Sequence, residues 1–179
     1  MLLKKTLQKI VITSLFSSLV IIFTFIKISL PLGNANTMIH LGNVVCLLSG
    51  LMLEPLYAGL AAGVGSFIFD LLNPLYCFSA PFNFVFKFIM AFICGLIYKS
   101  KIKNFKILIA TSLSSIIYIL LYGLKIFITN RYILKFSVEL TLFLLLKGLT
   151  ISIFNAILAI LFSTLIYKSI YKRLENITN

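Results

Sequence analysis

Long apolar runs separated by short polar connections make up most of the chain, and this pattern predicts helices that cross a membrane. The hydrocarbon core of a bilayer is about 30 Å thick, so a helix needs about 20 apolar residues to span it. The run at residues 41–53 would form a helix only about 20 Å long, which neighbouring helices or water would have to shield. We predict an all-α integral membrane protein, a single membrane domain over 1–179 with six transmembrane helices, at about 7–28, 41–53, 56–72, 82–98, 105–128 and 139–167.

The first run also fits a secretory signal peptide. A basic segment precedes it, and the small residues Gly33 and Ala35 follow it. The apolar core of a signal peptide is usually shorter than this run. We therefore expect the segment to be retained as a helix.

The connections between the runs carry turn signals. The stretch from Ser29 to Ile39 is rich in proline, glycine and asparagine, which predicts a loop on the outer side. Pro55 suits the first turn of a helix, so Glu54 and Pro55 predict a tight cytoplasmic turn between two short helices. Lys125 lies near the end of the fifth run, and we expect its ammonium group to reach the membrane surface.

Small residues predict close contacts between helices. Gly59 and Gly63 are four residues apart in the third run, which gives one helix face a shallow groove. Ser14 and Ser18 repeat this spacing in the first run, next to Ser17. These serines predict either packing within the protein or an interface with a separate membrane subunit, and both interpretations stay open.

Composition and charge agree with a membrane protein. Hydrophobic residues make up 61% of the chain and charged residues 11%, with a mean hydropathy of +1.12, so a soluble domain is excluded. The net charge of +12 is concentrated beside predicted cytoplasmic helix ends, which indicates membrane topology rather than nucleic-acid binding. We expect a multi-pass protein of the bacterial cytoplasmic membrane with both termini in the cytoplasm. The residues that mark this side are Lys4, Lys5, Lys9, Lys99, Lys101, Lys103, Lys106, Lys168, Lys172 and Arg173.

Polar residues inside or beside the apolar runs predict a binding site. Lys87 lies within the fourth run, and a lysine kept in hydrocarbon usually faces protein or a water-filled cavity. Asn83 is one helical turn before it on the same face. If Lys87 and Lys147 both face the cavity and Asp70 reaches one of them, one positive charge stays uncompensated, which favours an anionic or acceptor-rich ligand. The candidate substrate-binding residues are His40, Asn43, Asp70, Tyr76, Asn83, Phe84, Lys87, Lys147 and Asn155.

Other functions lack support in the residues. The sequence shows no paired carboxylates, catalytic triad or phosphate-binding loop, so we expect no enzymatic activity. The three cysteines are isolated and there is a single histidine, so we expect no metal site and no cofactor. A plainer interpretation of Lys147 is that its ammonium group binds a backbone carbonyl at a helix end. A stand-alone small-molecule carrier and a small lipid-modifying membrane enzyme remain as alternative functions.

Several motifs between residues 30 and 98 occur together in a known family. They are PLGN at 31–34, HLGN at 40–43, EPLYAGLAAGVGS at 54–66, DLL at 70–72 and APFNFVFK at 80–87. These residues resemble the substrate-binding S components of energy-coupling factor (ECF) vitamin transporters, closest to the branch for pyridoxine, hydroxymethylpyrimidine and related precursors.

The resemblance implies a six-helix protein that binds a small water-soluble vitamin from outside. Its partners would be a membrane coupling subunit and two ATP-binding subunits, and the S component would topple in the membrane to release its substrate. By position, Lys87 matches the lysine of the fourth helix and Asp70 the acid that closes the third. Asn43 stands where relatives commonly have aspartate, and Ser14 and Ser18 stand where they commonly have alanine.

Overall fold

A computed structural model of the chain describes residues 2–32, 35–101 and 105–178. Helices account for most of this part. The elements are α1 (Leu2–Phe25), β1 (Lys27–Leu32), β2 (Ala35–His40), α2 (Gly42–Met52), α3 (Pro55–Leu71), the 3-10 turn η1 (Cys77–Ser79), α4 (Ala80–Lys99), α5 (Lys106–Ile128), the π-helical turn η2 (Thr129–Ile133) and α6 (Val138–Thr178).

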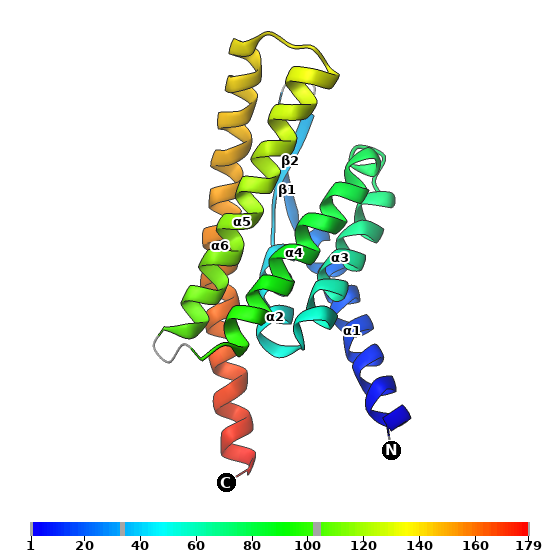
Figure 1. Cartoon of the computed structure of the whole chain (residues 1–179), viewed down its shortest axis with the longest axis vertical. Coiled ribbons are helices and arrows are strands. Elements are labelled where there is room, and N and C mark those ends of the chain that lie inside the picture. The colour runs from blue at the N-terminus through cyan, green and yellow to red at the C-terminus, as the bar shows by residue number, and fades with distance from the viewer. Residues whose placement is uncertain (1, 33–34, 102–104, 179) are drawn as a thin grey trace.

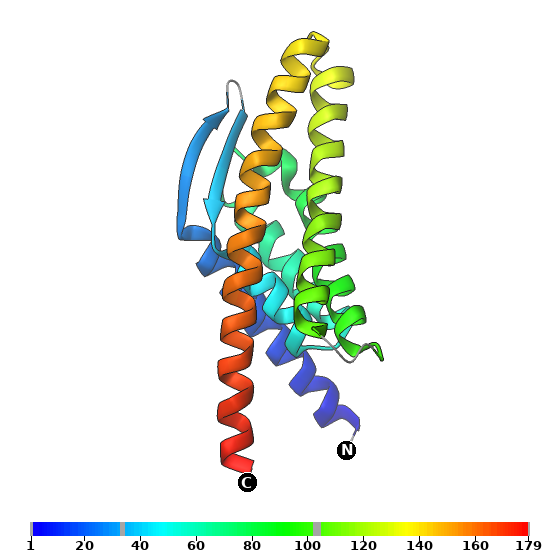
Figure 2. The ribbon, with the colours of Figure 1, turned by 90° about the vertical axis from the view of Figure 1, so that its left-hand side faces the viewer.

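Both chain ends lie at the same end of the molecule (Figure 1). Helices α5 and α6 run side by side as a long hairpin that rises past the connection between α3 and α4, and α1 is inclined to them (Figures 1 and 2). The C-terminal turns of α6 extend beyond the other helices at the terminal end. We call the end with both termini the terminal end and the other the distal end.

Four helical segments of the described chain are long and apolar enough to cross a membrane. They are Thr6–Phe25, Cys77–Lys99, Lys106–Ile133 and Val138–Tyr171, whereas α2 and α3 are shorter apolar helices. The exposed surface carries many large apolar side chains along these segments. A soluble protein does not expose this much apolar surface, so lipid is its natural environment.

The short helix α2 forms the centre of the bundle. Every residue from Gly42 to Leu51 is buried, and α1, α3, α4 and α6 all pack against it. An 11-residue helix is shorter than the hydrocarbon core of a bilayer, and the enclosing helices shield it from lipid. The expectation that neighbours shield this segment is confirmed.

Small residues on α3 bring two neighbouring helices close. A Cβ on Gly65 would lie 2.6 Å from the backbone oxygen of Ser17 in α1, and the Ser17 hydroxyl donates to the Ala61 carbonyl at 3.0 Å. On the other side, a Cβ on Gly63 would lie 3.1 Å from the ring and the backbone oxygen of Phe84 in α4. The predicted close-packing face of this helix is therefore confirmed.

The connection after α1 differs from the predicted loop. β1 and β2 pair as an antiparallel hairpin, with Lys27 opposite His40 and Ile28 opposite Ile39. The hairpin lies beside α6 (Figure 2). The prediction of irregular structure at 29–39 was wrong, and α1 ends at Phe25 rather than near residue 28 because Lys27 already belongs to the first strand.

Candidate functional site

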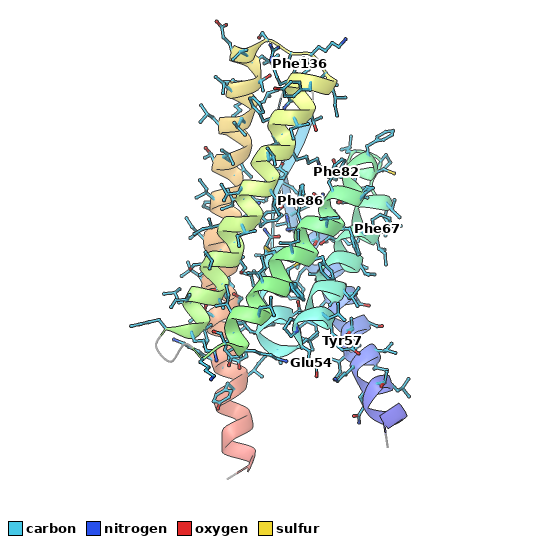
Figure 3. All side chains as sticks on the ribbon, in the orientation of Figure 1. Glu54, Tyr57, Phe67, Phe82, Phe86 and Phe136 are labelled. Carbon is cyan, nitrogen blue, oxygen red and sulfur yellow. The ribbon has the colours of Figure 1, made fainter. Side chains whose placement is uncertain are left out.

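A cavity of about 320 Å³ lies between the hairpin and helices α3 to α6. Part of its wall comes from the α3–α4 connection and from the segment after α5, so it opens toward the distal end. In Figure 3, Phe82 marks that side of α4, whereas Glu54 and Tyr57 mark the terminal end. The lining residues are Thr24, Met38, His40, Ser66, Phe69, Asp70, Leu75, Tyr76, Ser79, Asn83, Lys87, Tyr118, Tyr122, Lys125, Ile126, Thr129, Asn130, Leu134, Ser152 and Asn155.

Lys87 lines the deep part of this cavity. Its side chain is only 4% exposed, and its Nζ donates to Oδ1 of Asn43 on α2. The ammonium group lies 4.2 Å from the centroid of the Tyr118 ring on α5. Lys87 thus faces the protein interior rather than lipid. Asn43 does not itself border the cavity; it contacts the site through Lys87.

Asp70 and Asn83 form a second polar pair. Asn83 Nδ2 donates to Asp70 Oδ2 at 2.6 Å, which joins the last turn of α3 to the first turn of α4. Both residues line the cavity. Asp70 is buried, and Lys27, Lys87 and Lys125 are close enough to stabilise its carboxylate electrostatically. The predicted shared face of Asn83 and Lys87 therefore points into the cavity.

His40 and Asn155 connect the hairpin to α6. The His40 backbone N–H donates to Asn155 Oδ1 at 3.1 Å, and Asn155 Nδ2 donates to the Met38 carbonyl at 2.8 Å. His40 Nδ1 accepts a bond from the Gly42 backbone N–H. Burial, together with the charges of Lys87 and Lys27, lowers the pKa of His40 to about 3, so this imidazole is neutral at pH 7.

Lys125 belongs to the site, although its position in the sequence indicated the membrane surface. It lines the cavity, its Nζ donates to Ser79 Oγ at 2.7 Å, and it lies 5.5 Å from the centroid of the Phe82 ring. α5 continues into the π-helical turn, so Lys125 is further from the helix end than its apolar run indicated. Tyr118 and Tyr122 of the same helix also line the cavity but were not among the predicted site residues. A tyrosine in an apolar helix is common and does not by itself indicate a binding site.

Three predicted residues do not border the cavity: Asn43, which contacts it through Lys87, and Lys147 and Phe84, which lie outside it. Lys147 is exposed on α6, with its ammonium group 4.9 Å from the centroid of the Phe143 ring. The buried face of α6 passes through Leu144, Ser152 and Asn155, and Lys147 is about 80° around the helix from Asn155. Phe84 packs toward α3, against Gly63. Tyr76, by contrast, does line the cavity.

The three serines of α1 separate into two groups. Ser17 is buried and bonded to α3, so it serves packing within the protein. Ser14 and Ser18 are exposed, and their hydroxyls donate to carbonyls one turn earlier in their own helix. These two residues present a small, apolar-flanked face on the outside of α1.

Comparison with known proteins decides the family. A family model for the S component of ECF-type riboflavin transporters matches residues 4–172. The chain belongs to this family. It is therefore a component of a transporter and not an enzyme, which removes the lipid-modifying enzyme from the alternatives. The resemblance to S components is confirmed, whereas the pyridoxine branch stays a prediction, because the matching model is that of riboflavin transporters.

A solved structure supports the fold of this S component. The S component of a bacterial ECF transporter superposes with a TM-score of 0.67 at 18% sequence identity, over 97% of this chain and 99% of that chain. At this identity the similarity concerns the fold alone. No curated protein matches the chain by sequence.

Proposed function

We propose that this S component captures a small water-soluble vitamin at the outer face of the bacterial cytoplasmic membrane and passes it to ATP-driven partner subunits. One observation carries the proposal: a chain of this family encloses a cavity with buried polar groups and tyrosines, open at the end away from its termini. Its volume of about 320 Å³ lies at the lower end of the range for small-molecule sites.

Riboflavin is the leading candidate substrate. The name of the matching family supports it, and the isoalloxazine ring of a flavin offers a flat surface for the cavity's tyrosines and carbonyl acceptors for Lys87. A pyridoxine- or pyrimidine-type compound is the second candidate. It rests on the resemblance of residues 30–98 to that branch, and its smaller ring would leave part of the cavity to water.

The ligand and the role of Lys87 can be tested together. The purified protein is denatured, and the released small molecules are identified by absorbance and mass spectrometry. We then expect Lys87→Ala to weaken binding of that ligand about tenfold to a hundredfold, because a hydrogen bond from a charged donor is lost. Lys99→Ala, on the same helix at the terminal end, is the control. Unchanged ligand affinity in Lys87→Ala would show that Lys87 does not bind the ligand.

We further propose six transmembrane segments with both termini in the cytoplasm. The exposed basic residues Lys99, Lys101 and Lys168 lie at the terminal end, as expected for the cytoplasmic side. Cys77 is exposed in the α3–α4 connection, whereas Cys46 and Cys94 are buried. A membrane-impermeant maleimide should therefore label intact cells that express the protein, and Cys77→Ser should abolish the labelling. If Cys77 is labelled only after the membrane is permeabilised, the α3–α4 connection is cytoplasmic and the proposed topology is wrong.

The partners are proposed to be a membrane coupling subunit and two ATP-binding subunits, with Ser14 and Ser18 on the coupling face. Replacing both serines with leucine should leave ligand binding unchanged, because neither side chain faces the interior. The same change should reduce co-purification with the coupling subunit. Uptake by this chain alone, in vesicles free of any ATPase, would favour the stand-alone carrier instead.

A further inference from the structure

Basic side chains gather at the terminal end, where α4 ends and α5 begins (Figure 1). Lys99 is in the last turn of α4 and Lys106 is the first residue of α5. Each of the two residues ends a segment that is long and apolar enough to cross a membrane. They therefore lie at the depth where the hydrocarbon core gives way to lipid headgroups. Lys101 is exposed in the connection that follows α4.

Tyrosines connect these lysines to α6. The hydroxyl groups of Tyr98 on α4 and Tyr167 on α6 lie 2.5 Å apart, and the ring of Tyr167 stacks on that of Tyr171 one turn later. The ammonium group of Lys106 lies 5.3 Å from the centroid of the Tyr98 ring. One hydroxyl of the pair donates to the other, so one hydroxyl hydrogen remains for a further acceptor. Three helices thus contribute to one surface of basic groups and tyrosines.

Carboxylates compensate little of the positive charge on this surface. Glu54 interacts electrostatically with Lys99, but its ion pair is with Lys9, and that is the one ion pair among the described residues. Glu175 is eight residues beyond the tyrosine pair, about 12 Å further along the axis of α6. Lys106 has a ring face as its partner, which stabilises a cation without cancelling its charge. The charge of Lys106 therefore remains available to an anion.

An apolar surface continues from these polar groups along α5. Phe105, directly before Lys106, is 79% exposed, and Leu108 and Ile109 in the first turn of the helix are 48% and 39% exposed. A headgroup bound at Lys106 would place its acyl chains against these side chains. A free phosphate ion has no apolar part and would gain nothing from them. The combination of a cation with adjoining apolar surface fits a lipid rather than a soluble anion.

We propose that the terminal ends of α4, α5 and α6 form a binding site for an anionic phospholipid, with Lys106 and the Tyr98–Tyr167 pair holding the headgroup phosphate. The ammonium group of Lys106 pairs with the phosphate charge, and the remaining tyrosine hydroxyl hydrogen donates to a phosphate oxygen. The exposed lysines Lys101 and Lys168 repel the cationic group of a zwitterionic lipid, so they favour a headgroup of net negative charge. The bound lipid would join the end of α4 to α5 and α6.

Lipid titrations followed by native mass spectrometry test the proposal. The delipidated protein in detergent is titrated with phosphatidylglycerol and with phosphatidylcholine of the same acyl chains. We expect the wild-type protein to bind the anionic lipid about fivefold more tightly or better, and Lys106→Gln to lower this preference about fivefold. Lys106→Arg should keep the preference, because it keeps the charge. Replacing Tyr98 and Tyr167 together with phenylalanine should weaken both lipids about threefold, since both carry a phosphate.

Controls separate a specific site from general charge attraction. Lys135→Gln removes one exposed positive charge between η2 and α6, at the distal end, and should change neither affinity. Glycerol 3-phosphate, which lacks acyl chains, should not compete with the lipid. Equal binding of the two lipids by the wild-type protein, an equal loss of preference in Lys106→Gln and Lys135→Gln, or competition by glycerol 3-phosphate would each refute the inference. The vitamin plays no part in these titrations, so their failure leaves the proposed function untouched.

Discussion

Replacing Asn155 with leucine should release the β-hairpin from α6 and weaken ligand binding. The side-chain amide of Asn155 bonds to one strand at two points, the His40 N–H at 3.1 Å and the Met38 carbonyl at 2.8 Å. Both strand residues line the cavity. Leucine is close to asparagine in size but can make neither bond. The substitution therefore removes the polar attachment of β2 to α6 without opening a large void.

The cost follows from the two backbone groups that lose their partner. A buried polar group left without a hydrogen bond costs about 1–3 kcal/mol, so the two together cost about 2–6 kcal/mol. Water in the adjoining cavity can replace part of these bonds, and we expect about 2–4 kcal/mol. This cost applies to the docked hairpin rather than to the helices. Local opening should become more frequent, and ligand dissociation faster by about tenfold or more.

Hydrogen exchange measured by mass spectrometry gives the direct assay. Peptides that cover residues 38–40 should exchange faster in Asn155→Leu than in the wild-type protein, while peptides from α4 and α5 should not change. Thr150→Leu on the same helix is the control, because Thr150 is exposed and its hydroxyl bonds only within α6. Unchanged exchange at 38–40 in Asn155→Leu, together with unchanged ligand dissociation, would refute this account of hairpin docking.

Three further predictions follow from single residues. The pKa of His40 is lowered to about 3 in the folded state, whereas in the unfolded chain it is about 6.5. The unfolded chain therefore binds a proton on His40 at a higher pH than the folded protein, so the free energy of unfolding should fall as pH drops below about 6.5. Between pH 6.5 and 5 this free energy should fall by about 2 kcal/mol. Thermal melts in detergent across this range should show the slope, and His40→Gln should flatten it. Lys87→Met should raise the melting temperature of the ligand-free protein and abolish tight ligand binding. Removing a buried ammonium group relieves a desolvation cost of several kcal/mol, which exceeds the cost of losing its hydrogen bond to Asn43. A lower melting temperature would show that Lys87 is needed for the fold. Gly65→Ala should cost about 1–3 kcal/mol, since the new methyl group meets the Ser17 backbone at 2.6 Å, and an unchanged melt would show that α1 can move away freely.

Much of the site could be predicted from local spacing, because spacing fixes which residues share a helix face. Asn83 and Lys87 are one turn apart, and the structure places both in the cavity wall. The Glu54-Pro55 signal also located the start of α3, where Pro55 is the first helical residue. The length of α2 predicted that neighbours or water would shield it, and the structure shows that neighbouring helices do. These features depend on a few consecutive residues and on the thickness of a bilayer.

The errors arose where distant segments decide the outcome. Lys147 is eight residues from Asn155, a spacing that leaves it about 80° around the helix, and the neighbours of α6 bury only the Asn155 side. Lys125 was assigned to the surface because it lies near the end of an apolar run, but η2 continues the helical structure to Ile133. The pair Gly33-Asn34, which lies outside the described residues, is typical of two-residue connections between strands and is the local pattern that indicates this hairpin.

The partners of the two cavity lysines, Lys87 and Lys125, explain how charges can be kept inside a membrane protein and still serve a ligand. Asp70 is close enough to interact with both lysines electrostatically, but within the described residues it forms no salt bridge with either. A direct ion pair would have to be broken before a ligand could bind the ammonium group. Ring faces and neutral acceptors stabilise the ammonium groups more weakly and leave donors free. Within the described chain, the one ion pair is Lys9 with Glu54 at the terminal end. The cavity therefore keeps its charge for a ligand that supplies the acceptors, and the same feature makes the empty site less stable than the occupied one.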